Sequence, residues 1–220
     1  HVLKKITTSL IFLTFLTLSI PTATLALTED EFIDVVLGLD PLGDLPRTGW
    51  ALRGIERPES IAAHSLGVAY VAMLLVDVLR SEGTTVDGEL VLRMAVIHDA
   101  AEAVTGDVPM PSKTPEVRAA LHTVERTIVE RLLPASWVPM WAQAEDKETL
   151  EARIVKAADK LQMMIKALRY DSCGRRGLED FWRSPGNFCD MGLPCVGRVF
   201  EAIALRAGRP LPKPGGELSD

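Results

Sequence analysis

Four residues of this 220-residue chain have the side chains of a metal centre: His64, His98, Asp99 and Asp159. Each lies in a stretch that the sequence predicts to be helical, on or beside an apolar face. Imidazole and carboxylate ligands together suit Zn, Mn, Co or Fe, and all of these ions can activate water. If the four side chains converge, they form the centre of a metal-dependent hydrolase.

Taken one at a time, these residues have simpler interpretations. A single histidine on an apolar helical stripe, as His64 is, is more often a hydrogen-bonded core residue. Asp159 could form a salt bridge with Lys156, with Lys160 or with an arginine from elsewhere. Adjacent helical residues point about 100° apart, so a His-Asp pair lines one pocket only if that pocket lies between their directions. The carboxylate would then be largely buried and would need a cation or a paired charge.

The elements that must position these residues are helices. Apolar residues recur at three-four spacing, and Thr28 with Glu31 has the pattern of a capping box. The predicted helices span residues 28–39, 60–80, 88–104, 115–133, 147–170 and 193–207. Residues 40–58, rich in Pro, Gly and Arg, are interpreted as a loop. Because no β alternation and no internal repeat occurs, the sequence predicts an all-α, single-domain fold.

Composition limits the classes of function. Hydrophobic residues make up 47% of the chain, which is enough for one domain with a substantial core. A net charge of -6 and the lack of a long basic run argue against duplex nucleic acid as a partner. The three cysteines, Cys173, Cys189 and Cys195, form no C-x-x-C pair and favour reduced thiols, with one disulfide among them left open.

The two ends of the chain are set apart from the domain. Residues 1–26 have the layout of a secretory signal: Lys4 and Lys5, an apolar run, then small residues ending at Ala26. Because the chain starts at His1, a foreign or mis-assigned leader is the alternative. The sequence therefore predicts a leader over residues 1–26, a domain over 27–210 and a flexible tail over 211–220.

Three stretches of the chain resemble the HD-domain metal-dependent phosphohydrolases. The resemblance is closest to the branch of 5'-deoxynucleotidases that act on deoxyribonucleoside monophosphates. The stretches are RPESIAAHS at 57–65, HDAAEAVTGDVP at 98–109 and KAADKL at 156–161. The order H…HD…D indicates the superfamily, and the continuation E-x-x-x-G-D-x-P is specific for this branch. The resemblance spans roughly residues 47–170 and implies an HD-type helical bundle.

The resemblance implies that one divalent ion is held by His64, His98, Asp99 and Asp159, without selecting among Mn, Co, Fe, Zn and Ni. It also implies that Glu102 and Asp107 line the reaction site. On one predicted helix Glu102 follows Asp99 by three residues and shares its side, where it could orient or deprotonate water. Asp107 follows a glycine at the helix end and could orient water or protonate the leaving oxygen. Without the resemblance, Glu102 would be a solvated residue and Asp107 a turn cap.

Substrate contacts are predicted in the loop before His64. Arg47 and Arg53 flank Trp50 there, and the planar fork of arginine suits phosphate. In the resembled family an arginine of this loop holds the phosphate beside an aromatic residue near the sugar, so Arg47 is the first candidate and Arg53 the second. Ordinary surface charge is their alternative. Trp50 either packs against the sugar and excludes a 2'-hydroxyl or anchors the loop, and Thr105 is a further candidate phosphate contact.

These features predict hydrolysis of a phosphomonoester, with a 5'-deoxynucleotide as the leading substrate, in the cytoplasm or, if the leader is genuine, after export. One alternative is an HD enzyme for a nucleoside triphosphate or signalling nucleotide, against which the lack of an extended basic set argues weakly. A non-catalytic metal- or nucleotide-binding sensor is a second, disfavoured by the presence of Glu102 and Asp107. An exported helical binding protein is supported only by the leader. Wide apolar helix faces are compatible with a homodimer.

Overall fold

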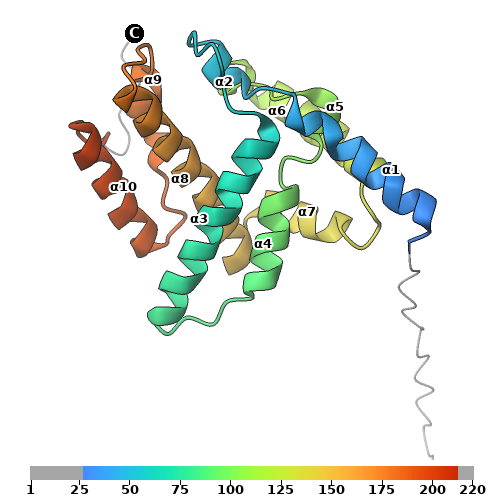
Figure 1. Ribbon diagram of the computed structural model, residues 1–220. Coiled ribbons are helices and arrows are strands. Elements are labelled where there is room, and N and C mark those ends of the chain that lie inside the picture. Colours follow the sequence, from blue (N-terminus) through green and yellow to red (C-terminus); the bar gives the residue numbers. More distant parts are fainter. Residues whose placement is uncertain (1–26, 213–220) are drawn as a thin grey trace, which may run out of the picture.

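The computed structural model describes residues 27–212, which are built from helices and connecting loops (Figure 1). The helices are α1 Glu29–Leu39, η1 Asp40–Gly43, α2 Thr48–Ala51, α3 Ile61–Ser81, α4 Gly88–Ile97, α5 Glu102–Thr105, η2 Met110–Ser112, α6 Pro115–Leu132, α7 Val138–Asp146, α8 Leu150–Ser172, α9 Glu179–Arg183, η3 Pro185–Phe188 and α10 Pro194–Ala207. Over residues 27–212 no strand occurs, and a single bridge joins Pro46 to Ser60. The predicted all-α fold is confirmed.

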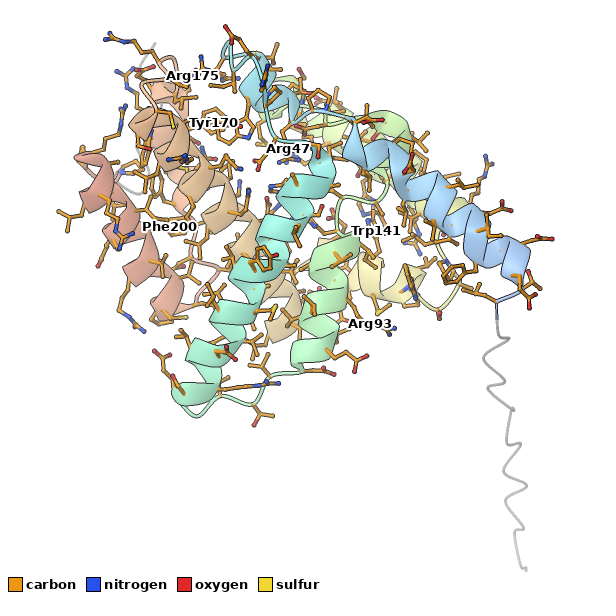
Figure 2. The ribbon with its side chains drawn as sticks, viewed as in Figure 1. Arg47, Arg93, Trp141, Tyr170, Arg175 and Phe200 are labelled. Carbon is orange, nitrogen blue, oxygen red and sulfur yellow. The ribbon has the colours of Figure 1, made fainter. Side chains whose placement is uncertain are left out.

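Helices α3 and α8 form the centre of the fold. They lie side by side, α4 packs against both, and α10 covers the outer side of α8 (Figure 1). Ser60 and Thr149 cap the two central helices, each accepting a hydrogen bond from a backbone N–H three residues later. Although α3 is long and apolar enough for a membrane span, its stripe packs here against α4, α8 and α10. The carboxyl end of α8, marked by Tyr170 in Figure 2, and the amino end of α3 face the α2 loop, which is marked there by Arg47.

The prediction of one helix over residues 88–104 is wrong, because the helix breaks at the His98-Asp99 dipeptide. The carbonyl oxygen of His98 would accept the N–H of Glu102 in a continuous helix. It accepts instead from Trp141 Nε1 at 3.1 Å, while the Glu102 N–H donates to the Asp99 carbonyl at 3.0 Å. These tighter turns end α4 at Ile97 and start the short α5 at Glu102. Glu102 therefore does not share a regular helix with His98 and Asp99.

Other boundaries follow the prediction within a few residues, with clear exceptions. The capping box of Thr28 and Glu31 is present. The helix predicted over 147–170 begins at Leu150, because Lys147 is left-handed with a φ of 58° and ends α7. The short helices α2, α7 and α9 were missed, since they are brief or rich in proline and aromatic residues. Residues 1–26, and 213–220 of the predicted tail, lie outside the described part of the chain.

Candidate active site

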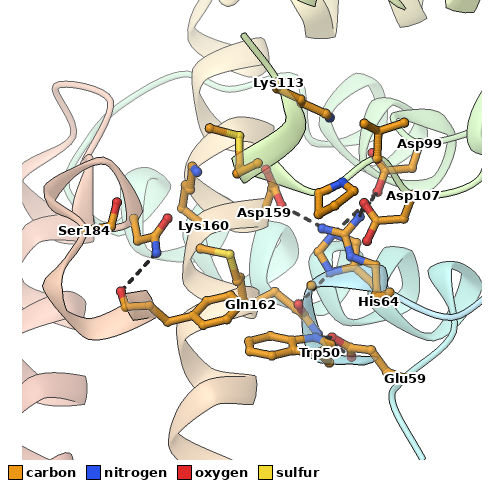
Figure 3. Close-up of a pocket in the computed structure, with 18 of the residues that line it drawn as sticks. Trp50, Glu59, His64, Asp99, Asp107, Lys113, Asp159, Lys160, Gln162 and Ser184 are labelled. Atoms are coloured by element: carbon orange, nitrogen blue, oxygen red, sulfur yellow. Dashed lines mark hydrogen bonds and ion pairs between the residues drawn. The ribbon is translucent and has the colours of Figure 1, made fainter. Parts of the chain in front are cut away.

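The four predicted metal ligands come from three segments and lie together. Three of them, His64, Asp99 and Asp159, are labelled in Figure 3. His64 is in the first turn of α3, Asp159 is in α8, and His98 and Asp99 form the turn after α4. His64 Nε2 lies 3.3 Å from Asp159 Oδ1 and 3.6 Å from Asp99 Oδ2, and His98 Nε2 lies 3.1 Å from the same Asp99 oxygen. Ligand atoms that share an ion at about 2.1 Å lie roughly 3–3.5 Å apart. The spacing therefore fits donors that share one ion.

The histidine rings are turned so that Nε2 is the free donor of each. His64 Nδ1 faces Gln162 Oε1 at 2.6 Å, and His98 Nδ1 faces the carbonyl oxygen of Ala95 at 2.8 Å. Because both partners are oxygen acceptors, each Nδ1 donates, and in the neutral form of each ring Nε2 carries the lone pair that a metal ion needs. Both Nε2 atoms are buried, and neither has an aligned hydrogen-bond partner within residues 27–212. Buried, unsatisfied imidazole nitrogens beside carboxylates fit a metal centre.

The two aspartates supply the charge that a divalent cation needs. Asp159 Oδ2 accepts from Lys156 Nζ at 2.6 Å while Oδ1 faces His64, so the salt bridge considered from the sequence coexists with the cluster. Burial alone would raise the pKa of Asp159, but Lys156 and His64 outweigh it and hold this pKa well below its usual range. For Asp99 the cost of burial is likewise overcome by His98 and Arg47, which lower its pKa. Both groups are therefore carboxylates at neutral pH.

Arg47 joins this cluster to the two predicted proton-handling residues. Its Nη1 atom lies 3.3 Å from Asp99, 3.5 Å from Glu102 and 3.3 Å from Asp107. The other oxygen of Asp107 accepts from the Thr48 N–H at 2.8 Å, which ties the start of α2 to the turn after α5. The guanidinium thus contacts three carboxyl groups beside the predicted metal ligands.

Glu102 is held in an environment that favours its neutral form. The side chain is buried, and burial together with Asp99 raises its pKa to about 10 against the opposing effect of Arg47. Without a divalent cation, Glu102 therefore carries a proton at neutral pH. A cation nearby favours the ionised carboxylate, which can accept a proton from water.

Arg53 and Thr105 have different positions relative to the site. Arg53 lines the same cavity, where its Nη2 atom lies 3.4 Å from Asp180 and its guanidinium lies over the Phe181 ring. Thr105 is not among the residues that line the cavity, and its hydroxyl donates to the Gly106 carbonyl at 3.0 Å. The structure therefore brings Arg53, but not Thr105, to the cavity wall.

Trp50 has the contacts of a loop anchor and also borders the cavity. Its side chain is 3% exposed, stacks on Phe181 with ring centroids 4.3 Å apart and meets Tyr170 edge-on. Its Nε1–H donates to Glu59 at 3.0 Å. This position is compatible both with a loop anchor and with a residue that packs against the sugar. A contact between Trp50 and the sugar stays a prediction.

All the predicted site residues except Thr105 and His98 line one cavity of about 610 Å³, a size suited to a nucleotide. Three further cations line it that were not among the predicted substrate contacts: Lys113, Lys156 and Lys160. Two of them flank Asp159 at positions -3 and +1 and were considered only as its salt-bridge partners. Lys113 follows the proline-rich break and had no recognisable signal.

Sequence reasoning also missed one polar pair and one wall of the cavity. Gln162 follows Asp159 by three residues, and that spacing on one helix face was an available signal. Glu59, which Gln162 contacts, lies inside the matched RPESIAAHS stretch without an assigned role. The far wall includes Phe181, Ser184 and Asn187, from a region with no recognised motif.

Comparison with known proteins agrees with this geometry. A family model described as HD domain matches residues 39–184. The 5'-deoxynucleotidase HDDC2 of Xenopus laevis is 32% identical over 150 residues, 64% of this chain and 70% of that protein. The 5'-deoxynucleotidase hdd1 of Schizosaccharomyces pombe is 31% identical over 151 residues, 63% of this chain and 73% of that protein.

Solved structures show the same fold. A conserved hypothetical protein from Pyrococcus furiosus superposes with a TM-score of 0.68 at 32% identity, over 79% of this chain and 98% of that one. A predicted metal-dependent phosphohydrolase from Magnetospirillum magnetotacticum gives a TM-score of 0.60 at 25% identity, over 83% and 95%. The family match spans well over half of the chain and contains the whole charged cluster. The chain therefore belongs to the HD-domain family, in the branch that includes these 5'-deoxynucleotidase relatives.

Proposed function

We propose that this protein is a metal-dependent 5'-nucleotidase that hydrolyses deoxyribonucleoside 5'-monophosphates to a deoxynucleoside and phosphate. The observation that carries the proposal is that two lone-pair imidazole nitrogens, two ionised carboxylates and the Arg47 guanidinium meet in one place. The names of the relatives support the substrate class.

The roles of the side chains follow from their positions. An ion bound by the two histidines and two aspartates would polarise the phosphoryl group and lower the pKa of water. Arg47 is placed to neutralise phosphate oxygens with its planar fork. Glu102 accepts a proton from the attacking water as the water oxygen bonds to phosphorus. Asp107, held by the Thr48 N–H, orients this water or relays the proton taken up by Glu102 to the 5' oxygen as its bond to phosphorus breaks.

Removal of the metal is expected to abolish phosphate release. After treatment with a chelator, added Mn, Co or Zn should restore release from deoxyribonucleoside monophosphates, and much less from ribonucleoside monophosphates. The measurement is phosphate release from a panel of deoxy- and ribonucleoside mono- and triphosphates. Metal binding without turnover of any of them would contradict the proposal and favour a sensor.

Hydrolysis of a nucleoside triphosphate is the second candidate, and one observation favours it. The sequence argument against it was the lack of an extended basic set, whereas Lys113, Lys156 and Lys160 line the cavity together with two arginines. However, Lys156 already pairs with Asp159 and one arginine with Asp180, so fewer cations are available to a triphosphate tail. The monophosphate therefore stays first, and the substrate panel separates the two.

Arg47→Lys is expected to lower kcat/KM for a deoxyribonucleoside monophosphate about 10- to 100-fold, because a lysine cannot reproduce a bidentate contact. Arg53→Lys is the matched comparison and should cost less, since Arg53 contacts Asp180 and the Phe181 ring and none of the predicted metal ligands. Steady-state kinetics of the two variants under saturating metal measure the difference. A larger loss in Arg53→Lys would reverse the assignment of the phosphate contact.

We place this reaction in the cytoplasm. Cys173, Cys189 and Cys195 are all free thiols, which suits a reducing compartment. Fractionation of cells that express the full chain tests this placement, and recovery outside the cytoplasm with a cleaved leader would contradict it.

A further inference from the structure

A buried chain of hydrogen bonds runs from His64 to the loop residue Trp50 through Gln162 and Glu59 (Figure 3). Gln162 Oε1 faces His64 Nδ1 at 2.6 Å, and Gln162 Nε2 donates to Glu59 Oε2 at 3.0 Å. The other oxygen of Glu59 accepts from Trp50 Nε1 at 3.0 Å. All four side chains are buried, the most exposed being Glu59 at 8%. These hydrogen bonds therefore connect the metal cluster to the predicted substrate loop without passing through solvent.

The direction of each hydrogen bond in this chain follows from the groups involved. A carboxylate only accepts, so Glu59 turns the NH₂ group of Gln162 toward itself. The amide oxygen of Gln162 then faces His64, which must donate from Nδ1. In the neutral ring Nε2 is then left with the lone pair, and it is the atom that faces Asp99 and Asp159. Glu59 thus selects the tautomer of a histidine that it does not touch.

We propose that Glu59 and Gln162 are positioning residues that hold His64 in its metal-binding tautomer. Because Glu59 also anchors Trp50, the metal ligands and the loop that carries Arg47 are held as one unit. Lys166 Nζ, 2.9 Å from Glu59 Oε2, balances the charge of the buried carboxylate. The catalytic consequence rests on the proposed function, whereas the tautomer and the metal affinity rest on the hydrogen bonds alone.

Helix α3 leaves space at Gly67 for the Gln162 side chain of this hydrogen-bond network. A Cβ atom at this position would lie 2.9 Å from both Cγ and Nε2 of Gln162. Gly67→Ala would therefore displace the amide from its partners. At the same time alanine favours the helical backbone more than glycine does. This substitution separates the positioning role from a general loss of stability.

The test is titration of the metal-free full chain with cobalt(II), followed by visible absorption, in four single variants and one double variant. Gln162→Leu, Glu59→Leu and Gly67→Ala should each weaken cobalt binding about 10- to 100-fold. The double variant Glu59→Leu/Gln162→Leu should bind no more weakly than Gln162→Leu, because Glu59 acts through Gln162. Tyr170→Phe is the control: it removes the hydroxyl that accepts from the Glu59 N–H but keeps the ring beside Trp50.

Long-range ¹⁵N–¹H correlations of the histidine rings give a readout that does not depend on activity. At a pH where the ring is neutral, His64 of the metal-free chain should carry its proton on Nδ1, and Gln162→Leu and Gly67→Ala should move it to Nε2. Cobalt binding by Gly67→Ala and Gln162→Leu as tight as in Tyr170→Phe would overturn the proposal, as would additive losses in the double variant. An unmodified chain that binds cobalt but hydrolyses no nucleotide would refute the proposed function alone.

Discussion

Asp159→Asn is expected to abolish divalent-metal binding and all metal-dependent phosphate release. The substitution replaces an ionised carboxylate with a neutral amide at the centre of the cluster, 3.3 Å from His64 Nε2. Loss of a directly coordinating charge should weaken cobalt binding by well over about 100-fold, more than loss of a supporting hydrogen bond does. Calorimetric titration of the metal-free chain measures the affinity, and metal analysis of the purified variant provides an independent check.

The same substitution should destabilise the metal-free fold in a pH-dependent way. Lys156 loses the partner that lies 2.6 Å away, so the free energy of unfolding in a chelator should fall by about 1–3 kcal/mol at pH 7. The folded-state pKa of Asp159 is depressed, so its contribution is present above the unfolded pKa of about 3.9 and is lost as the pH falls below it. The difference from the unsubstituted chain should therefore shrink below about pH 4.

Asp171→Asn is the matched control for these two measurements. Asp171 lies near the carboxyl end of the same helix and pairs with Arg209 at 3.2 Å, away from the cluster. Its loss should leave cobalt affinity unchanged. Unchanged cobalt affinity in Asp159→Asn would instead show that the ion, if bound, is held elsewhere.

The central helices could be predicted because each carries its own pattern. In α3 the apolar stripe, the Ser60 cap and the later glycine all lie within one stretch of sequence, so local reasoning was sufficient. The same holds for α8, which placed Asp159 on the inner side of a buried helix. Two rigid helices with their patterns intact bring His64 and Asp159 together, and the family resemblance implied a shared ion for these two residues with His98 and Asp99.

The rest of the site depends on contacts between distant segments. The helix break at His98 occurs because Trp141, 43 residues later, donates to its carbonyl. No local pattern contains that information, so a continuous helix was the natural prediction. Gln162 and Glu59 are connected to the metal ligands by hydrogen bonds to each other and to His64. Neither residue indicates such a role from its own place in the sequence. Lys156 and Lys160 of the cavity wall were visible as residues, but the direction of their side chains depends on how α8 packs.

Glu102→Gln is expected to remove turnover while preserving the fold and the metal site. The amide keeps the size of the side chain but cannot accept a proton from water. We therefore expect kcat to fall by about 10²- to 10⁴-fold, with KM and cobalt affinity nearly unchanged. Steady-state kinetics at saturating cobalt, together with cobalt titration, separate this result from loss of the metal.

Stability should change in the opposite direction to activity. The folded-state pKa of Glu102, about 10, lies above the unfolded value of about 4.3, so the metal-free fold loses stability as the pH rises between them. A neutral amide removes this loss, and Glu102→Gln should be more stable in a chelator by about 1–3 kcal/mol at pH 8, with little difference near pH 4.5.

Glu125→Gln is the control that separates burial from catalysis. Burial on α6 also raises the pKa of Glu125, to about 7, but this residue does not line the cavity. Its substitution should stabilise the metal-free chain above pH 7 and leave turnover intact. If Glu102→Gln keeps its turnover as Glu125→Gln does, the proton acceptor is a different group. Because Asp107 is the other predicted proton-handling residue beside Arg47, it would then be the next residue to test.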